Sequence, residues 1–466
     1  ELEARLVELY DAQVLNYHLA LGSGDQARLH FYLAGSQERF RAVESEEVEQ
    51  VVGRLIRTWT DRVRAGLERV RPPDEARRLS RRYGHAVSAE YQAATDPDIA
   101  VEDILELEAM QADGRQISIA FANRDTSLAA PGVEGVTELK VYLRDERLIL
   151  SDFMPILENT GLRVIAVNPF EVRGEGVGRA TLYVFAVQDG EGNPLDVEDR
   201  GGLLAETILA VRAGDVLNDE LNRLVLGAGL HWREVDVLRA YAAYAFQAGA
   251  VPSRLSLRSA LVKHPGIARE LFDLFVTRFD PRAHVTMEDR RETERDIQTV
   301  FQSSLVGVSS LADDRALRRL EQLIRATMRT NYFRHGGLAP TFRSGGVPYT
   351  SFKFACRDLE FLRGTRLLYE VWVHSARMEG MHLRGSRVAR GGIRWSDRPD
   401  DFRTEILGLV KTQMVKNAVI VPGGSKGGFI TRVQPDEPEA RFEEGRRQYT
   451  TLIRGLLDLT DNLGAD

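Results

Sequence analysis

Residues 422–429, PGGSKGGF, place Lys426 between two pairs of glycines. Because glycine has no side chain, such a backbone can turn sharply or come close to another group. A lysine that is partly removed from water there can transfer protons or polarise a carbonyl or an imine. The stretch is neither a Walker A phosphate cradle, since Gly427 follows the lysine, nor the dinucleotide pattern G-x-G-x-x-G. It predicts a glycine loop whose lysine takes part in acid–base chemistry.

A second glycine pair beside a cation lies upstream, at Arg390-Gly391-Gly392, and Lys416 lies near the end of the helix predicted between the two glycine stretches. If these three cations converge, two of them can bind the two carboxylates of a small dianion and leave Lys426 for chemistry. The alternative is that each glycine pair only forms a turn and that Lys416 faces solvent. The spacing alone leaves both open.

The elements that must position these residues indicate a multidomain protein, since 466 residues are too many for one hydrophobic core. We expect a mixed, mainly helical region at 1–110 that includes a strand at ARLHFYLAG. Residues 111–200 follow a β-α-β-β order, half or more of a ferredoxin-like sandwich. Residues 201–330 are helical throughout, and 331–466 return to mixed structure. The predicted fold class is a combination of α+β and α/β domains.

Local patterns place individual elements within these regions. A stripe of apolar residues at every fourth position predicts one helix over 45–70. In the second region, we expect a strand at 139–143, a helix from its N-cap Ser151 to Asn159 with Gly161 as C-cap, and a turn at RGEGVG. In the fourth region, YTSFKFAC and RLLYEVWVHSA are typical of strands. DDFRTEILGLVKTQMVKNAV and the segment from RFEEGRRQ onward are typical of helices.

Composition excludes several classes of function. The net charge of −7 argues against a general nucleic-acid binder, and no apolar run is long enough to predict a membrane-spanning helix. The only cysteine, Cys356, cannot form an internal disulfide, which fits a reducing compartment such as the cytoplasm. His335, His374 and His382 show no metal-ligand spacing, so no metal site is expected. Both ends of the sequence resemble cuts in a longer chain.

The string VARGGIRWSDRPDDFRTEILGLVKTQMVKNAVIVPGGSKGGF closely resembles the start of the catalytic domain in the large, long-subunit NAD-dependent glutamate dehydrogenases of bacteria. YLRDERLILSDFMPILENTGLRVI and RMEGMHLRGSRVARGG resemble the same family. The resemblance runs through most of the chain and is strongest from about 345 to 430.

The resemblance implies a role for each motif residue. Lys426 matches the catalytic lysine that assists the attack of water on iminoglutarate, and Lys416 matches the lysine that binds the α-carboxylate of the substrate. Arg390, beside Gly391 and Gly392, stands where smaller glutamate dehydrogenases carry a lysine for the side-chain carboxylate. The planar guanidinium suits a carboxylate held by two hydrogen bonds.

This chain departs from the family's pattern at one residue, and it does not contain two of the family's functional parts. Ser425 stands where alanine is more usual, and a serine is small enough to be tolerated. The family's catalytic aspartate and its NAD-binding Rossmann domain lie further downstream, and no G-x-G-x-x-G with a following acidic residue occurs here. We therefore assign no residue of this chain to NAD, and we expect the chain alone to be inactive.

The implied activity is the NAD-dependent oxidative deamination of L-glutamate to 2-oxoglutarate and ammonia by a cytoplasmic homo-oligomer. Residues 111–200 resemble the ACT-type regulatory modules of the family, which bind amino-acid effectors, although a purely structural role is equally open. One alternative is a non-catalytic regulatory or oligomerisation segment with ACT-like amino-acid sensing. A dehydrogenase for an apolar amino acid is the other, and Arg390 disfavours it. We expect Trp395 to pack beneath the glycine loop and Cys356 to be buried in a strand.

Overall fold

The computed structural model describes residues 2–21, 27–56, 58–124, 135–282, 286–334, 347–387, 389–416 and 424–460. Its internal contacts divide the chain into two compact units, one of residues 1–118, 141–147 and 169–183, the other of residues 119–140, 148–168 and 184–466. Within the part of the chain described, no helix is both long enough and apolar enough to cross a membrane.

The first unit begins with helix α1 (Leu2–Tyr10) and an antiparallel hairpin, β1 (Gln13–Leu21) with β2 (Ala27–Ala34), which confirms the predicted strand at ARLHFYLAG. Six helices follow: α2 (Gln37–Ala42), α3 (Ser45–Ile56), α4 (Trp59–Glu68), α5 (Pro73–Ala86), α6 (Ala89–Ala94) and α7 (Pro97–Asp113). The single helix predicted over 45–70 is wrong. A capping box starts α4 separately, because the side chain of Thr58 accepts from the Asp61 N–H while the Asp61 carboxylate accepts from the Thr58 N–H.

A buried carboxylate ties helix α7 to the tyrosines packed against it. Asp103, only 2% exposed, accepts the hydroxyls of Tyr91 at 2.5 Å and Tyr142 at 2.7 Å. Burial and the charge of Asp103 hold the pKa of Tyr142 well above its usual value. Buried polar groups need such partners, since an unpaired carboxylate here would lose its hydration without compensation.

A four-stranded sheet has the order β3-β4-β6-β5. Its strands are β3 (Ile117–Asn123), β4 (Thr137–Arg144), β5 (Arg163–Gly174) and β6 (Gly178–Gln188). Helix α8 (Leu150–Asn159) connects β4 to β5 and so crosses β6, which lies between them. The predicted succession of strand, helix, strand and strand is observed, with β3 preceding it, and the RGEGVG turn joins β5 to β6.

The predicted start of α8 is wrong. The helix begins one residue before Ser151, and Ile149 occupies the N-cap position without a side-chain hydrogen bond. The Ser151 hydroxyl contacts the Asp152 carboxylate at 3.4 Å instead. Gly161 follows the C-cap with a φ of 89°, the left-handed conformation expected of a glycine at a helix end.

The region predicted to be helical contains a succession of helices within the second unit: α9 (Val197–Ala213), η1 (Glu220–Asn222), α10 (Arg223–Ala228), α11 (Trp232–Gln247), α12 (Arg254–Lys263), α13 (Pro265–Phe279), α14 (Met287–Val306) and α15 (Leu311–Ala326). Helix α11 is buried over most of its length, because small and aromatic residues alternate around it. It therefore forms a central support of this unit.

A six-stranded sheet follows, in the order β11-β12-β10-β9-β8-β7. Its strands are β7 (Thr327–Thr330), β8 (Tyr349–Ala355), β9 (Tyr369–Ser375), β10 (Met378–Arg384), β11 (Ile393–Trp395) and β12 (Ser425–Thr431). The strands predicted at YTSFKFAC and RLLYEVWVHSA are confirmed as β8 and β9. The helices predicted after them are confirmed as α16 (Phe402–Lys416) and α17 (Pro438–Leu457).

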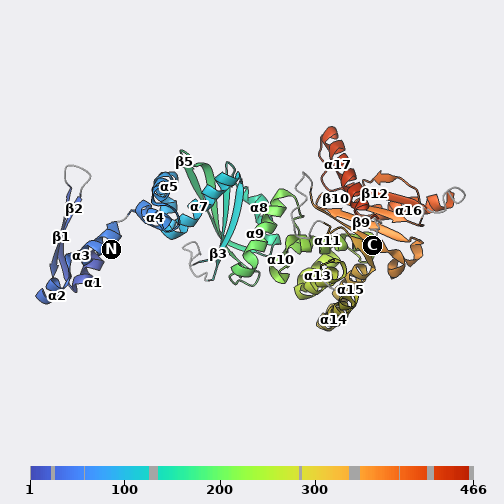
Figure 1. Ribbon diagram of the computed structural model, residues 1–466, viewed down its shortest axis with the longest axis horizontal. Helices are drawn as coiled ribbons and strands as arrows, with labels where there is room; N and C mark the ends of the chain where they lie inside the picture. Colours follow the sequence, from blue (N-terminus) through green and yellow to red (C-terminus); the bar gives the residue numbers. More distant parts are fainter. Residues whose placement is uncertain are drawn as a thin grey trace. The chain divides into compact units, whose positions relative to one another are not determined.

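Helices cover both faces of this sheet (Figure 1). On one face, a Cβ added at Gly380 of β10 would lie 2.8 Å from Leu452 of α17. On the other face, Gly428 of β12 approaches Ile406 of α16. Helix α11 packs on the α16 side, where the Tyr244 ring stacks on Phe354 with centroids 4.2 Å apart. The sheet is thus enclosed between α17 and the pair α11 and α16.

A buried ion-pair cluster joins α11 to the turn before α10. Arg239 is fully buried and donates to Asp219 through Nε at 3.0 Å, to Asp236 through Nη1 at 2.8 Å and to Asn222 through Nη2 at 2.7 Å. Burial opposes charge on all these groups, but the carboxylates outweigh it and raise the pKa of Arg239. The cluster therefore stabilises the fold only while each buried charge keeps its partner.

Replacing Arg239 by methionine would leave Asp219 and Asp236 without the arginine that they share. Breaking a buried ion pair in this way costs about 3–5 kcal/mol of unfolding free energy. We expect Arg239→Met to lower the thermal midpoint clearly in scanning calorimetry. Arg282→Met, which removes an arginine whose side chain is 67% exposed, should leave the midpoint unchanged. Equal midpoints for the two variants would contradict the stabilising role of the cluster.

Candidate active site

Lys426 lies on a strand, not in a loop. Strand β12 is paired antiparallel with β10, where Leu383 is opposite Lys426, and parallel with β11, where Ile393 is opposite Gly427. The Gly427 N–H donates to the carbonyl oxygen of Gly392 at 3.1 Å. The prediction of a glycine loop is therefore wrong for residues 425–429, and 421–423 lie outside the described residues.

Close packing explains the glycines of this strand pair. A Cβ at Gly391 would lie 1.5 Å from the carbonyl oxygen of Ser425, so no other residue fits without moving the backbone. A Cβ at Gly428 would lie 2.5 Å from Cδ1 of Ile406 on α16. The glycines allow a neighbouring strand and a helix to approach β12 closely, which is a recognised role of glycine within a sheet.

The side chain of Lys426 projects to the face covered by α16. Alternate residues of a strand share a face, and Gly428, two positions further, packs on that helix. The nearest atom to a Cβ built at Gly392 is the Lys426 amine nitrogen, at 4.0 Å. Lys426 is partly buried, while Gly392 is exposed. The structure thus brings the lysine amine to the second glycine pair, which is one of the two arrangements that the spacing left open.

Arg390 reaches the same place through its backbone. It forms a parallel bridge with Gly424, directly before β12, and its carbonyl oxygen accepts Nε2 of Gln413 at 2.5 Å. Arg390 itself is exposed. Lys416 is the last residue of α16, and its side chain lies outside the described residues. Sequence reasoning did not single out Gln413. It lies three residues before Lys416, a spacing that places both residues on one face of a helix.

Glu405 of α16 holds strand β11 in place. One of its carboxylate oxygens contacts Arg394 Nε at 2.6 Å, and the other accepts the Ser396 hydroxyl at 2.6 Å. The Ser396 N–H continues the pairing by donating to the carbonyl of Phe429 at 2.8 Å. Sequence reasoning also missed Glu405, since a carboxylate in the first turn of a helix is usually only a favourable partner of the helix dipole.

Trp395 packs on the opposite face of the sheet from the Lys426 amine. Its ring stacks on Phe429 with centroids 6.0 Å apart and an interplanar angle of 8°, and it lies against Gly445 of α17. The side chain remains 41% exposed. Trp395 thus supports β12 from the α17 side.

Burial shifts the pKa of the two described histidines among these candidates, and of the cysteine. Burial, and then the charge of Arg384, lowers the pKa of His382, and burial holds the pKa of His374 well below its usual value. Burial raises the pKa of Cys356, which begins a 3₁₀ turn directly after β8. His335 lies outside the described residues. Across those residues, no cluster of three or more His, Cys, Asp or Glu side chains could hold a metal ion.

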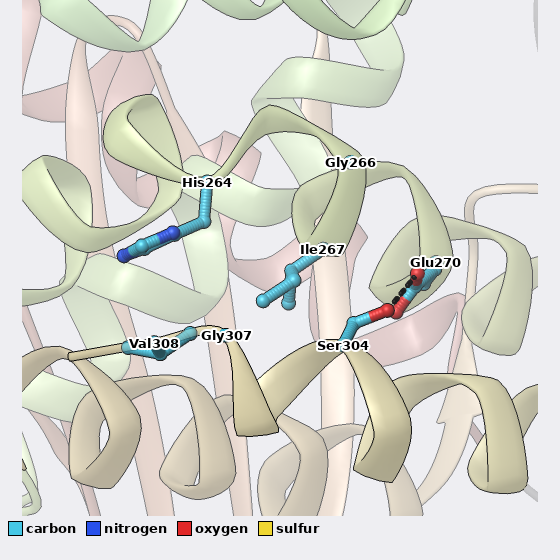
Figure 2. Close-up of a pocket in the computed structure, with 7 residues that line it drawn as sticks. All are labelled: His264, Gly266, Ile267, Glu270, Ser304, Gly307 and Val308. Atoms are coloured by element: carbon cyan, nitrogen blue, oxygen red, sulfur yellow. Dashed lines mark hydrogen bonds between the residues drawn. The ribbon is translucent and has the colours of Figure 1, made fainter.

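A separate cavity of about 360 Å³ lies between the start of α13 and the end of α14 (Figure 2). Ser304 donates to Glu270 across it at 2.7 Å, and His264, Ile267 and Val308 line the rest. None of the residues predicted for the active site lines this cavity.

Comparisons with known proteins show which families the chain resembles. Family models match at residues 300–466 (the catalytic domain of bacterial NAD-glutamate dehydrogenase) and, for glutamate dehydrogenase, at 216–281 (helical motif 3), 125–200 (the ACT3 domain) and 67–110 (helical motif 2). NAD-specific glutamate dehydrogenases from Halomonas elongata, Pseudomonas aeruginosa and Mycobacterium tuberculosis are 37%, 36% and 34% identical over 99% of the chain.

The matched family models place two helical motifs and an ACT domain ahead of a glutamate dehydrogenase catalytic domain along this chain. The chain belongs to the family of bacterial NAD-dependent glutamate dehydrogenases. It spans 28% of the length of the Halomonas and Pseudomonas relatives and 29% of the Mycobacterium relative.

The two glycines of the upstream pair should respond differently to alanine. In Gly391→Ala the new methyl would overlap the Ser425 carbonyl, and overpacking against backbone should cost about 1–3 kcal/mol or more. In Gly392→Ala the nearest atom is the Lys426 amine at 4.0 Å, so stability should change by less than about 0.5 kcal/mol. Urea denaturation of both variants checks this. Equal stabilities would contradict the close approach of β11 and β12.

Proposed function

We propose that the full-length protein catalyses the NAD-dependent oxidative deamination of L-glutamate to 2-oxoglutarate and ammonia. The proposal rests on one observation. The Lys426 amine approaches the Gly391-Gly392 backbone, which Arg390 directly precedes. The names of the relatives support the same activity. The proposal includes a cytoplasmic location, because the single cysteine fits a reducing compartment.

Lys426 acts as the proton partner when water attacks the imine formed from glutamate. Lys426 is partly buried and its amine lies next to Gly392, so a substrate can pack against the backbone there. A positioned amine of this kind contributes as a general acid and base, and its charge stabilises the oxygen that develops on the attacked carbon. The strand that carries it is hydrogen-bonded on both sides, which fixes the backbone from which the side chain extends.

Arg390 and Lys416 bind the two carboxylates of the substrate. Arg390 holds the side-chain carboxylate and Lys416 the α-carboxylate, which fixes Cα for transfer of its hydride. Gln413 fixes the Arg390 backbone to α16, so both binding residues depend on one helix. NAD, when bound, accepts the hydride from Cα.

The division of the chain is part of the proposal. Residues 111–200 form an ACT-like module, since β4, α8, β5 and β6 give the split β-α-β arrangement of a ferredoxin-like sheet and β3 fills the outer position beside β4. We propose that this module binds an amino-acid effector and that the enzyme is a homo-oligomer. Residues 1–110, 201–330 and 331–466 are the other regions, the last being the start of the catalytic domain.

A direct test is an NADH absorbance assay on the full-length protein with L-glutamate and NAD. Glutamate-dependent formation of NADH, and its reversal with 2-oxoglutarate and ammonium, is the expected result. A protein that folds and assembles but forms no NADH would support the alternative of a non-catalytic regulatory segment.

Lys426→Ala in the full-length enzyme should lower kcat by far more than it raises the KM for glutamate. The reason is that Lys426 is assigned to the transition state and not to ground-state binding. Steady-state kinetics separates the two parameters. A variant with near-normal kcat and a raised KM would move Lys426 to the binding of substrate.

Arg390→Leu should reduce kcat/KM for glutamate by roughly tenfold to several hundredfold, because a charge-assisted pair to a buried carboxylate is worth about 1.5–3 kcal/mol and an unpaired partner costs more. Norvaline, which lacks the side-chain carboxylate, should lose much less. Parallel kinetics on both substrates decides the point. Equal losses for both would mean that Arg390 supports the backbone of the site and does not bind the side-chain carboxylate.

A further inference from the structure

The first turn of α16 is held by a residue from another helix. Gln247, at the end of α11, donates from Nε2 to the carbonyl of Pro399 at 2.8 Å, and its Oε1 accepts the N–H of Arg403 at 3.3 Å. The first N–H groups of a helix have no partner within the helix, so Gln247 supplies a cap from outside. Gln247 is 5% exposed, so water does not compete freely for these bonds.

Arg254 of α12 fixes the segment just before α16. Its Nη2 donates to the same Pro399 carbonyl at 2.5 Å, and its Nη1 donates at 3.0 Å to Glu379 of β10, which is fully buried. The guanidinium also lies over the ring of Phe246, 4.7 Å from its centroid. Arg254 thus joins the approach to α16, the sheet and α11.

A third contact anchors the first turn of α16 through its own arginine. Arg403 donates to both carboxylate oxygens of Glu370 on β9, from Nε at 3.0 Å and from Nη2 at 2.5 Å. Tyr244 of α11 donates its hydroxyl to the same carboxylate at 2.8 Å. Such two-point pairs are geometrically specific, so they restrict the rotation as well as the position of the helix.

The opposite end of α16 carries Gln413 and Lys416, about 22 Å from its start at 1.5 Å per residue. The backbone hydrogen bonds of a helix resist bending over a few turns, so a shift of its first turn is passed on in part to its last. We propose that α11 and α12 set the affinity of the substrate site by fixing the first turn of α16, with Gln247 and Arg254 as positioning residues. This inference rests on the proposed function, because it takes the last turn of α16 to bind substrate.

The geometry separates two kinetic effects. Lys426 is on β12, which is held by its own strand neighbours, whereas the carboxylate-binding residues depend on α16. Loosening α16 should therefore weaken substrate binding more than it slows the chemical step. Any movement of α11 and α12 would then change the affinity of the site for glutamate.

The test is Gln247→Met in the full-length enzyme, a change that keeps the length of the side chain and removes both hydrogen bonds. The matched control is Gln302→Met on α14. This exposed glutamine accepts a hydrogen bond from Arg318 at 2.8 Å, so its replacement removes a bond that does not involve α16. We expect Gln247→Met to raise the KM for glutamate roughly tenfold, as expected for the loss of two neutral hydrogen bonds. Its kcat should change by less than about threefold. The KM for NAD should not change, and the control should match the parent enzyme.

Hydrogen exchange provides a readout that does not need turnover. The amides of the first turn of α16 should exchange faster in Gln247→Met than in the parent, while those of α17 should not change. Gln247→Glu, which keeps the acceptor for the Arg403 N–H, should restore part of the protection and part of the affinity. This second variant also serves if Gln247→Met fails to fold.

Three outcomes would overturn the inference: exchange in α16 that stays at the parent rate, faster exchange with an unchanged KM for glutamate, and a fall in kcat with an unchanged KM. A parent enzyme that forms no NADH from glutamate would instead contradict the proposed function, while the exchange experiment would still measure whether Gln247 holds α16.

Discussion

The close approach of two backbones, Gly391 against the carbonyl of Ser425, is the constraint on which the site depends. It allows β11 and β12 to pair in parallel, although β12 is antiparallel to β10 on its other side. Two adjacent parallel strands need a crossover, and α16 supplies it. The end of α16 therefore returns to the edge of the sheet at which both strands begin. Arg390, Lys416 and Lys426 occupy these three ends.

This topology explains why residues up to 36 positions apart in sequence, from Arg390 to Lys426, lie at one edge of the sheet. The strand pair fixes the backbones of Lys426 and of the glycine pair, while the crossover helix brings in Gln413. Glu405, earlier on the same helix, holds Arg394 and Ser396 at the far end of the short strand. One helix thus fastens β11 at both ends, and the helix is itself fastened by buried groups of α11 and by the partly buried Arg254 of α12.

The sequence raised the convergence of the glycine pairs as one of two alternatives, and it did not predict the strand pair that brings them together. Glycine has low strand propensity, so SKGGF was interpreted as a loop, and only the neighbouring carbonyl and the Ile406 side chain explain why glycine is needed in a strand. The roles of Arg390, Lys416 and Lys426 came from the family resemblance, and they remain proposals. Gln413 and Gln247 could not be assigned, because their partners are backbone groups distant in sequence.

The helix boundaries show a different limit of pattern reading. The apolar stripe of Val51, Leu55, Trp59 and Val63 continues across the boundary between α3 and α4, so periodicity alone indicated one helix. The boundary signal was local, since Thr58 and Asp61 have the spacing of a capping box. Apolar periodicity indicates which face of a helix is buried, whereas the capping residues indicate where the helix begins.

The buried thiol of Cys356 has a practical consequence for spectroscopy. It is the only cysteine in the sequence, it is 1% exposed, and burial together with the charge of Glu370 raises its pKa. Thiol reagents act on the exposed thiolate, which Cys356 does not offer at neutral pH. A cysteine introduced on the surface of this chain would therefore be labelled selectively without removing the native one, so paired spin or fluorescence probes need only two added residues.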